Sequence, residues 1–287
     1  MKLENKAILI LIFVTAMWGL TFPLIHNAMQ DIGPFAFVFV RMVLATIGFL
    51  PFVFKRFRNT NSLLFWGGLL LAILNTVTYL FQSEGLETIS ASRSAFITGT
   101  NVILVPLLAP LFRFGRPKIY EVIAALFCML GLYILTGESV SHISVGDIWT
   151  FGCALLYALT ILTLQIISKR CKDNTLLGFY LTAFGMLVPA AFLYHSDFQH
   201  VFSPAVIIAL LFCAFIATAL VNYLMTHYQQ HVSVTKVAVI YALEPVFATV
   251  FSVLIEHEHL NYQIYVGGGV IFFSILLPDL IRLARKN

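Results

Sequence analysis

The chain has 287 residues, of which 60% are hydrophobic and only 10% are charged. A soluble domain carries about 25% charged residues, so this composition excludes a soluble globular protein and indicates one that folds in lipid. The net charge of +4 is modest and forms no basic stripe, which excludes a nucleic-acid partner.

Ten apolar stretches follow one another along the chain, and each is long enough to cross a bilayer, which takes about 20 residues. In lipid every backbone N–H and C=O group needs a partner within its own segment, so these stretches are predicted to be helices. The fold class is therefore an all-α membrane protein with ten transmembrane helices. The predicted spans cover residues 7–27, 33–54, 63–82, 90–112, 118–136, 146–167, 174–194, 203–223, 232–255 and 261–281.

The first stretch follows Lys2 and Lys6 and has some features of a signal peptide. Its apolar run from Ala7 to Ile25 is too long for a signal core, and no small-residue cleavage site follows it. We therefore expect this stretch to be retained as the first span.

The spans contain a small set of polar and aromatic residues that we expect to face a central cavity. Aromatic walls with few polar groups suit an amphipathic organic solute, although some of these residues are expected only to pack between helices. In chain order they are Trp18 and Thr21 in span 7–27, Arg41 in 33–54, Asn75 and Tyr79 in 63–82, Thr98 and Asn101 in 90–112, Tyr157 in 146–167, Asn222 in 203–223, and Tyr241 and Glu244 in 232–255.

The basic residues predict how the spans are oriented. Of the 17 Lys and Arg residues, 14 fall at the chain ends or in the loops after the second, fourth and sixth spans, all on one side. The other three, Arg41, Arg93 and Lys236, lie within spans. By the positive-inside rule the basic side is the cytoplasm. Both termini are therefore predicted to be cytoplasmic, in a bacterial inner membrane.

The two halves of the chain overlay weakly at a shift of 143 residues. At that shift Arg93 aligns with Lys236, and Asn101 aligns with Glu244. Because each half has five spans, the second half must cross the membrane in the opposite sense, an arrangement that many carriers use for alternating access. We predict one repeat over residues 1–142 and an inverted repeat over 143–287.

Five segments in a fixed order carry a resemblance to a known family. They are AMWGLTFPLI at 16–25, GPFAFVFVRMVLA at 33–45, SASRSAFITGTNVILVPLLAPLF at 90–112, VSVTKVAVIYALEPVFATVFSVLIEHEHL at 232–260 and YVGGGVIFFSIL at 265–276. These segments resemble the EamA-like ten-helix branch of the drug/metabolite transporter superfamily. The resemblance implies a helix bundle with a central cavity and transport by alternating access. One departure is Tyr157, where the family often has Trp.

Glu244 ranks first among the ionisable candidates, because it lies near the middle of its span beside Pro245. A charge at mid-bilayer costs roughly 2.5–3.5 kcal/mol, so its carboxylate should face the cavity or a polar partner. One interpretation couples its protonation to transport. The other is that it hydrogen-bonds a neighbouring helix at the kink made by Pro245.

The three basic residues within spans also have two interpretations each. Arg41 either holds a substrate carboxylate or pairs with Glu244 or a backbone carbonyl and holds the bundle together. Arg93, expected near the outer mouth, and Lys236, expected near the inner mouth, either gate the pathway and attract anions or extend to the lipid headgroups.

The segment EHEH at 256–259 offers four potential metal ligands. Consecutive residues rarely all face one point, so we expect no metal site there. The four cysteines are far apart and form no CxxC pair, which predicts packing residues. The sequence has no phosphate-binding loop, dinucleotide fingerprint or nucleophile–base motif, so no cofactor is expected.

Together these patterns predict a secondary transporter that moves a small organic metabolite, an amino acid or a related solute, with export as the expected direction. Its expected partners are the solute and the bilayer, and a proton or another coupling ion stays open. Two alternatives remain. One is a sensor or assembly subunit without transport. The other is a membrane-embedded enzyme that uses the outer histidines, His195, His200, His257 and His259.

Overall fold

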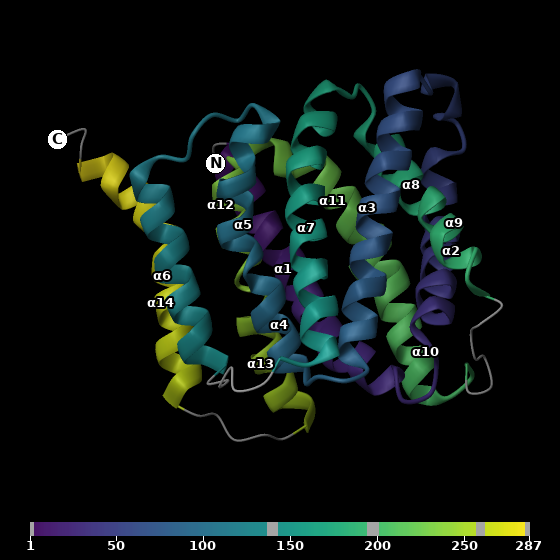
Figure 1. The fold of residues 1–287 in the computed structure, drawn as a ribbon. Coiled ribbons are helices and arrows are strands. Elements are labelled where there is room, and N and C mark those ends of the chain that lie inside the picture. The colour runs from purple at the N-terminus through teal and green to yellow at the C-terminus, as the bar shows by residue number, and fades with distance from the viewer. Residues whose placement is uncertain (1–2, 137–142, 194–200, 257–261, 285–287) are drawn as a thin grey trace.

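The computed structural model describes residues 3–136, 143–193, 201–256 and 262–284, and every regular element within them is a helix (Figure 1). In chain order the helices are α1 (Leu3–Ala28), α2 (Pro34–Val53), α3 (Ser62–Leu86), α4 (Ala91–Gly99), α5 (Asn101–Leu108), α6 (Ile119–Thr136), α7 (Val145–Arg170), α8 (Asn174–Ala183), α9 (Leu187–Ala190), α10 (Pro204–Leu211), the π-helical η5 (Phe212–Leu220), α11 (Val221–Tyr228), α12 (Val234–Tyr241), α13 (Glu244–Glu256) and α14 (Tyr262–Ala284). The short 3₁₀ turns are η1 (Phe57–Asn59), η2 (Ala109–Phe112), η3 (Phe184–Met186) and η6 (Gln229–His231).

These elements make up ten membrane helices, which confirms the predicted fold class. Seven helices of the described residues are long and apolar enough to cross a bilayer. Three shorter apolar helices, at 119–134, 174–190 and 265–278, complete the set. Several helices run past their predicted ends, because polar residues continue the backbone hydrogen bonding where the apolar run has stopped.

The first helices of the two halves, α1 and α7, run in opposite directions (Figure 1). The start of α1 lies against the segment 228–236, where the Lys6 ammonium sits 5.5 Å from the centroid of the Tyr228 ring. The end of α7 reaches the same segment, because Gln165 Nε2 donates to the Val232 carbonyl at 2.9 Å. The two five-helix repeats are therefore inverted.

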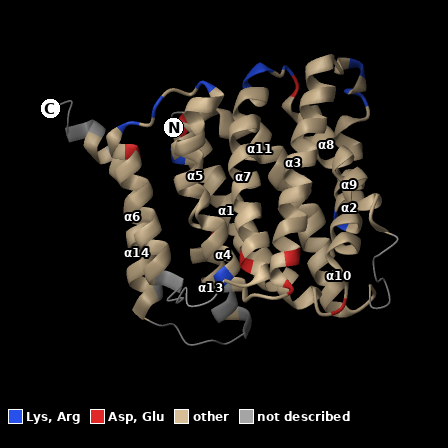
Figure 2. Cartoon of the chain, in the orientation of Figure 1, with Lys and Arg blue, Asp and Glu red and all other residues tan. Residues whose placement is uncertain are grey.

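Lys and Arg residues gather at the end of the bundle where α1 starts (Figure 2). There the turn after α2 meets the turn after α7, since Arg56 Nη1 lies 3.2 Å from Asp173 Oδ2 and Asn59 Nδ2 lies 3.3 Å from it. Burial favours a higher pKa for Asp173, but the Leu176 N–H, Asn59 and Arg56 outweigh it and hold that pKa below its usual value of 3.8. The carboxylate is therefore charged at neutral pH and joins the two turns.

The fourth and ninth membrane helices, each predicted as one continuous span, are broken in the middle. The fourth consists of α4 and α5, and the ninth of α12 and α13. Their second pieces begin at Asn101 and Glu244, which are 143 positions apart. At each break, the N–H of Thr100 or Leu243 bonds to the carbonyl three residues back, at 3.1 Å in both cases. Hydropathy does not register such a tight turn, because the apolar side chains continue across it.

Gly19 lets α1 lie directly against α13 next to the second break. A Cβ atom at Gly19 would be 2.5 Å from Phe247 Cβ and 3.0 Å from the Glu244 carbonyl oxygen. Only glycine allows this approach. The crossing places Trp18 and Thr21 beside the start of α13, where the candidate site begins.

Candidate functional site

A small buried cavity lies inside the bundle, beside the break between α12 and α13. Six helices, α1, α2, α3, α4, α7 and α13, contribute side chains to its wall. Its volume is about 20 Å³, which is room for roughly one water molecule. In this form the cavity is too small for a metabolite. The lining residues are Trp18, Thr21, Arg41, Asn75, Thr78, Tyr79, Gln82, Thr98, Cys153, Tyr157 and Glu244.

Most of the predicted cavity residues meet at this one space. They come from both halves of the chain, and the structure brings together Trp18, Thr21, Arg41, Asn75, Tyr79, Thr98, Tyr157 and Glu244. Their role in binding a solute stays a prediction.

Arg41 is the buried cation of the cavity, with 1% of its surface exposed. Its Nε donates to Thr218 Oγ1 at 2.7 Å, and its guanidinium carbon lies 3.9 Å from the centroid of the Tyr79 ring. The face of an aromatic ring stabilises a cation held above it. Neither terminal nitrogen is bonded to any described residue, and Arg41 forms no ion pair with Glu244. The predicted pairing with Glu244 or a backbone carbonyl is thus replaced by a hydroxyl and an aromatic ring.

Glu244 is the buried acidic residue of the same cavity, and it is the first residue of α13. A carboxylate at a helix N-terminus is stabilised by the positive end of the helix dipole. Its side chain makes no hydrogen bond or ion pair with any described residue. The alternative of a hydrogen bond to a neighbouring helix is therefore not formed here. The cavity therefore contains a guanidinium and a carboxyl group that form no ion pair with each other.

Three aromatic rings pack together between the cavity and α12. Trp18 makes edge contacts with Tyr157 and Tyr241, at centroid distances of 5.6 and 5.2 Å, and the two tyrosines stack at 5.8 Å. Trp18 Nε1 donates to the Ala217 carbonyl at 3.2 Å. Ala217 belongs to η5, where π-helical bonding shifts the backbone register. The π-helix thus supplies an anchor for the indole.

The Tyr241 hydroxyl continues this packing into a hydrogen-bonded network on the basic side. It donates to Gln229 Oε1 at 3.1 Å, and Gln229 Nε2 donates to the Ile161 carbonyl at 2.8 Å. Tyr241 therefore lies behind Trp18 and Tyr157 and is not among the lining residues.

Four lining side chains have polar atoms that are buried without a hydrogen-bond partner among the described residues. They are Asn75 Nδ2, Tyr79 Oη, Thr98 Oγ1 and Tyr157 Oη. Leaving such an atom unpaired costs about 1–3 kcal/mol. These atoms are therefore available to hydrogen-bond with water or a polar solute in the cavity.

Asn101 and Asn222 are predicted cavity residues that the structure places elsewhere. The break at Thr100 separates Asn101 from the helix face that presents Thr98, and its side-chain amide is buried without a partner among the described residues. Asn222 instead faces α8, where its Nδ2 donates to Thr182 Oγ1 at 3.1 Å.

Sequence reasoning missed several residues of the site. Thr78, Gln82 and Cys153 line the cavity, and Thr218 positions Arg41. Thr78 and Gln82 follow Asn75 at helical spacing, so a longer polar stripe on α3 was a usable signal. Nothing local marks Thr218, which lies 177 positions from its partner.

Arg93 does not line the cavity. It lies in the first turn of α4, which begins at the end of the bundle away from the basic turns (Figure 1). Arg93 Nε is 2.6 Å from Asp147 Oδ1, and Arg93 Nη2 is 2.9 Å from Asp147 Oδ2. Asp147 also accepts a bond from the Ser144 N–H at 2.7 Å and so caps the start of α7. Arg93 therefore joins α4 to α7.

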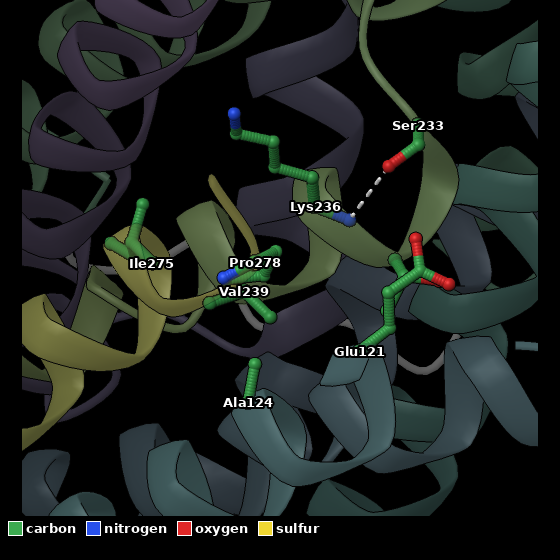
Figure 3. A pocket seen from close by; sticks show the side chains of 8 residues that line it. Glu121, Ala124, Ser233, Lys236, Val239, Ile275 and Pro278 are labelled. Carbon is green, nitrogen blue, oxygen red and sulfur yellow. Dashed lines mark hydrogen bonds between the residues drawn. The ribbon is translucent and has the colours of Figure 1, made fainter. Parts of the chain in front are cut away.

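Lys236 lies at the opposite end, in a pocket of about 10 Å³ formed by α6, α12 and α14 (Figure 3). Its Nζ is 3.9 Å from Glu4 Oε1 of α1. Figure 3 shows the lysine side chain extending away from the Glu121 carboxylate. The Lys236 side chain is only 8% exposed, so it ends in this protein contact rather than among headgroups.

The segment 257–259 and the histidines His195 and His200 lie outside the described residues. Within the described part of the chain, no group of three or more His, Cys, Asp or Glu residues could hold a metal ion.

Comparison with known proteins finds a family match in each half of the chain. The model of the EamA-like transporter family matches residues 5–137 and again residues 144–278. An "uncharacterized transporter" of Archaeoglobus fulgidus is 31% identical over 94% of this chain and 84% of its own length. The "uncharacterized transporter YvbV" of Bacillus subtilis is 24% identical over 99% of this chain and 94% of its own length. A crystal structure with 13% identity superposes with a TM-score of 0.80, over 99% of this chain and 100% of that one, which shows a shared fold.

Proposed function

The chain belongs to the EamA-like transporter family and is a multi-pass membrane transporter rather than an enzyme, and from this premise we propose that it carries zwitterionic metabolites such as amino acids. It works as a secondary transporter by alternating access, with export as its direction. The observation that carries this proposal is that a buried basic residue, Arg41, and a buried acidic residue, Glu244, line one cavity.

The two charges fit a solute that carries both a carboxylate and an ammonium group. The terminal nitrogens of Arg41 bind a carboxylate through two parallel hydrogen bonds, and Glu244 accepts the ammonium. A solute with one charge leaves the other side chain buried and unpaired, which is costly. The cavity therefore selects against simple acids, simple amines and neutral compounds.

The remaining walls favour a solute with an apolar portion and a few polar atoms. Trp18, Tyr79 and Tyr157 offer aromatic surface, and the unpaired atoms of Asn75 and Thr98 offer hydrogen bonds. This combination orients an amphipathic solute while its side chain packs against the rings.

Glu244 also provides a means of coupling solute export to proton entry. A proton and the ammonium of the solute compete for the same carboxylate, so release of one favours binding of the other. Proton entry in exchange for solute then drives export. The concentration of basic residues at one end (Figure 2) supports cytoplasmic termini in a bacterial inner membrane.

Flux into proteoliposomes tests the proposal with three solute sets: amino acids, the amines that lack the carboxylate, and the acids that lack the amine. Saturable flux is expected for the amino acids alone, and an imposed pH gradient should drive it. Arg41→Gln and Glu244→Gln should each lower the transport efficiency by about 10- to 100-fold, because each removes a hydrogen bond between charged groups.

Arg58→Gln is the matched control, because Arg58 is exposed in the basic turn after α2 and does not line the cavity. It should transport at the wild-type rate. Equal flux of the amines or acids, or full activity in both cavity variants, would refute zwitterion recognition. No flux of any solute would favour a sensor or assembly subunit.

A further inference from the structure

Two ion pairs occupy matching positions in the two repeats, at opposite ends of the bundle. Arg93 pairs with Asp147 at one end, and Lys236 pairs with Glu4 at the other. A shift of 143 positions carries Arg93 onto Lys236 and Glu4 onto Asp147. Both members of one pair are thus the repeat mates of the members of the other.

The local structure around the two cations is also the same. Each lies three residues after a serine that caps its helix: Arg93 N–H bonds to Ser90 Oγ at 3.2 Å, and Lys236 N–H bonds to Ser233 Oγ at 3.4 Å. A cation in the first turn is disfavoured by the dipole of its own helix. An acid from another helix offsets this effect.

That acid comes from the other half of the chain in both cases. Arg93 of α4 pairs with Asp147 at the start of α7, and Lys236 of α12 pairs with Glu4 at the start of α1. Both cations sit on the helix piece that precedes a break beside the cavity. Each pair therefore joins the two halves at one end of the bundle only.

We propose that these ion pairs are the two latches of the transport cycle. The outer latch, Arg93–Asp147, breaks when the cavity opens away from the basic turns. The inner latch, Lys236–Glu4, breaks when the cavity opens toward them. This inference rests on the proposed function. Both latches are formed here, in agreement with a cavity of about 20 Å³ that is closed to a metabolite.

The outer latch is the stronger of the two. It has two contacts, at 2.6 and 2.9 Å, between side chains that are 20% and 9% exposed. In the inner latch, Lys236 Nζ lies 3.9 Å from Glu4 Oε1, and the Glu4 side chain is 50% exposed. Paired contacts with Arg are strong, whereas exposed pairs contribute little. Loss of the outer latch should therefore have the larger effect.

Cys153 lines the cavity and reports on which side is open, because it is fully buried in the closed form. The test uses a chain in which only this cysteine remains, after replacement of Cys128, Cys171 and Cys213 by Ala. A membrane-impermeant thiol reagent is added to either side of vesicles of known orientation. The labelling rate of Cys153 from each side is measured without any substrate.

Asp147→Asn should raise labelling from the side away from the basic turns by about tenfold. Glu4→Gln should raise labelling from the basic side by about threefold. Arg93→Gln breaks the outer latch while Asp147 still caps α7, so it should repeat the Asp147→Asn result even if that variant folds poorly. Glu87→Gln and Glu121→Gln remove acids near the same ends, and both should label as the parent does.

The latch proposal would be refuted if a variant raised labelling equally from both sides, or only from the side opposite to the one expected. This outcome is separate from the flux test. If the protein transports amino acids but the variants show no side-specific labelling, the proposed function stands and the latch proposal is refuted.

Discussion

At the scale of single residues, the site depends on polar groups that hold one another in place inside the membrane. Arg41 is fixed by the Thr218 hydroxyl and the Tyr79 ring, and Trp18 by the Ala217 carbonyl. These anchors use few of the available hydrogen-bonding atoms. The terminal nitrogens of Arg41 and the carboxyl group of Glu244 are thereby left without a partner among the described residues, and we propose that a solute binds them.

Replacing Thr218 with Val tests the anchoring of Arg41. The hydroxyl is lost while the shape is kept, so Arg41 Nε is left without its acceptor, and the free energy of unfolding should fall by about 1–3 kcal/mol. The KM for amino acids should rise as well. Thermal unfolding in detergent and flux kinetics measure both effects.

Thr160→Val is the control for this change. The Thr160 hydroxyl is equally buried, but it donates only to the Leu156 carbonyl of its own helix, at 2.9 Å. Its loss should cost less than about 0.5 kcal/mol. Similar losses in both variants would show that Thr218 has no special role for Arg41.

At the scale of elements, irregular helices build the site. The fourth and ninth membrane helices break beside the cavity, and the eighth contains the π-helix η5. Irregular backbone is tolerated at membrane depth where it is enclosed by protein. Close crossings provide this enclosure, and the crossing of α1 over α13 at Gly19 is the one that bounds the cavity.

Gly19→Ala should be strongly destabilising, because the added methyl group would lie 2.5 Å from Phe247 Cβ and 2.9 Å from the Ala248 backbone nitrogen. Overpacking of this kind costs about 1–3 kcal/mol. Gly269→Ala in α14 meets nothing within 4 Å, so it should be neutral or stabilise by up to about 1 kcal/mol. The thermal unfolding temperature should fall for Gly19→Ala and should stay the same or rise for Gly269→Ala. A neutral Gly19→Ala would contradict the close crossing.

At the scale of the whole molecule, two inverted repeats give the bundle two comparable ends. Each end has an ion pair that joins the halves, and the basic turns distinguish one end from the other (Figure 2). The Arg56–Asp173 contact further links the turns after α2 and α7. A carrier needs such ends, because each must open while the other stays closed.

Cysteine labelling in cells tests this arrangement directly. Cysteines at Lys55 and Lys172, in the two joined turns, should both be protected from an impermeant reagent added outside. A cysteine at Gln30, in the turn after α1, should react with it. Protection of Lys55 together with exposure of Lys172 would contradict the inverted fold.

The sequence by itself determined that the chain folds in lipid, how many membrane helices it has, and that its two halves cross the membrane in opposite senses. Hydropathy over about 20 residues marks each span, and the odd number of spans per half requires inversion. Basic residues on one side predict which end of the bundle faces the cytoplasm. These are local or additive properties of the chain, so they need no knowledge of contacts.

Only the tertiary structure decided which polar groups meet. The Arg41–Thr218 bond joins residues 177 positions apart, and the breaks at Thr100 and Leu243 displace Asn101 from the cavity while Glu244 stays in its wall. Such contacts depend on how each helix is rotated and where it crosses its neighbours. Apolar periodicity leaves both undetermined when nearly every face of a helix is hydrophobic.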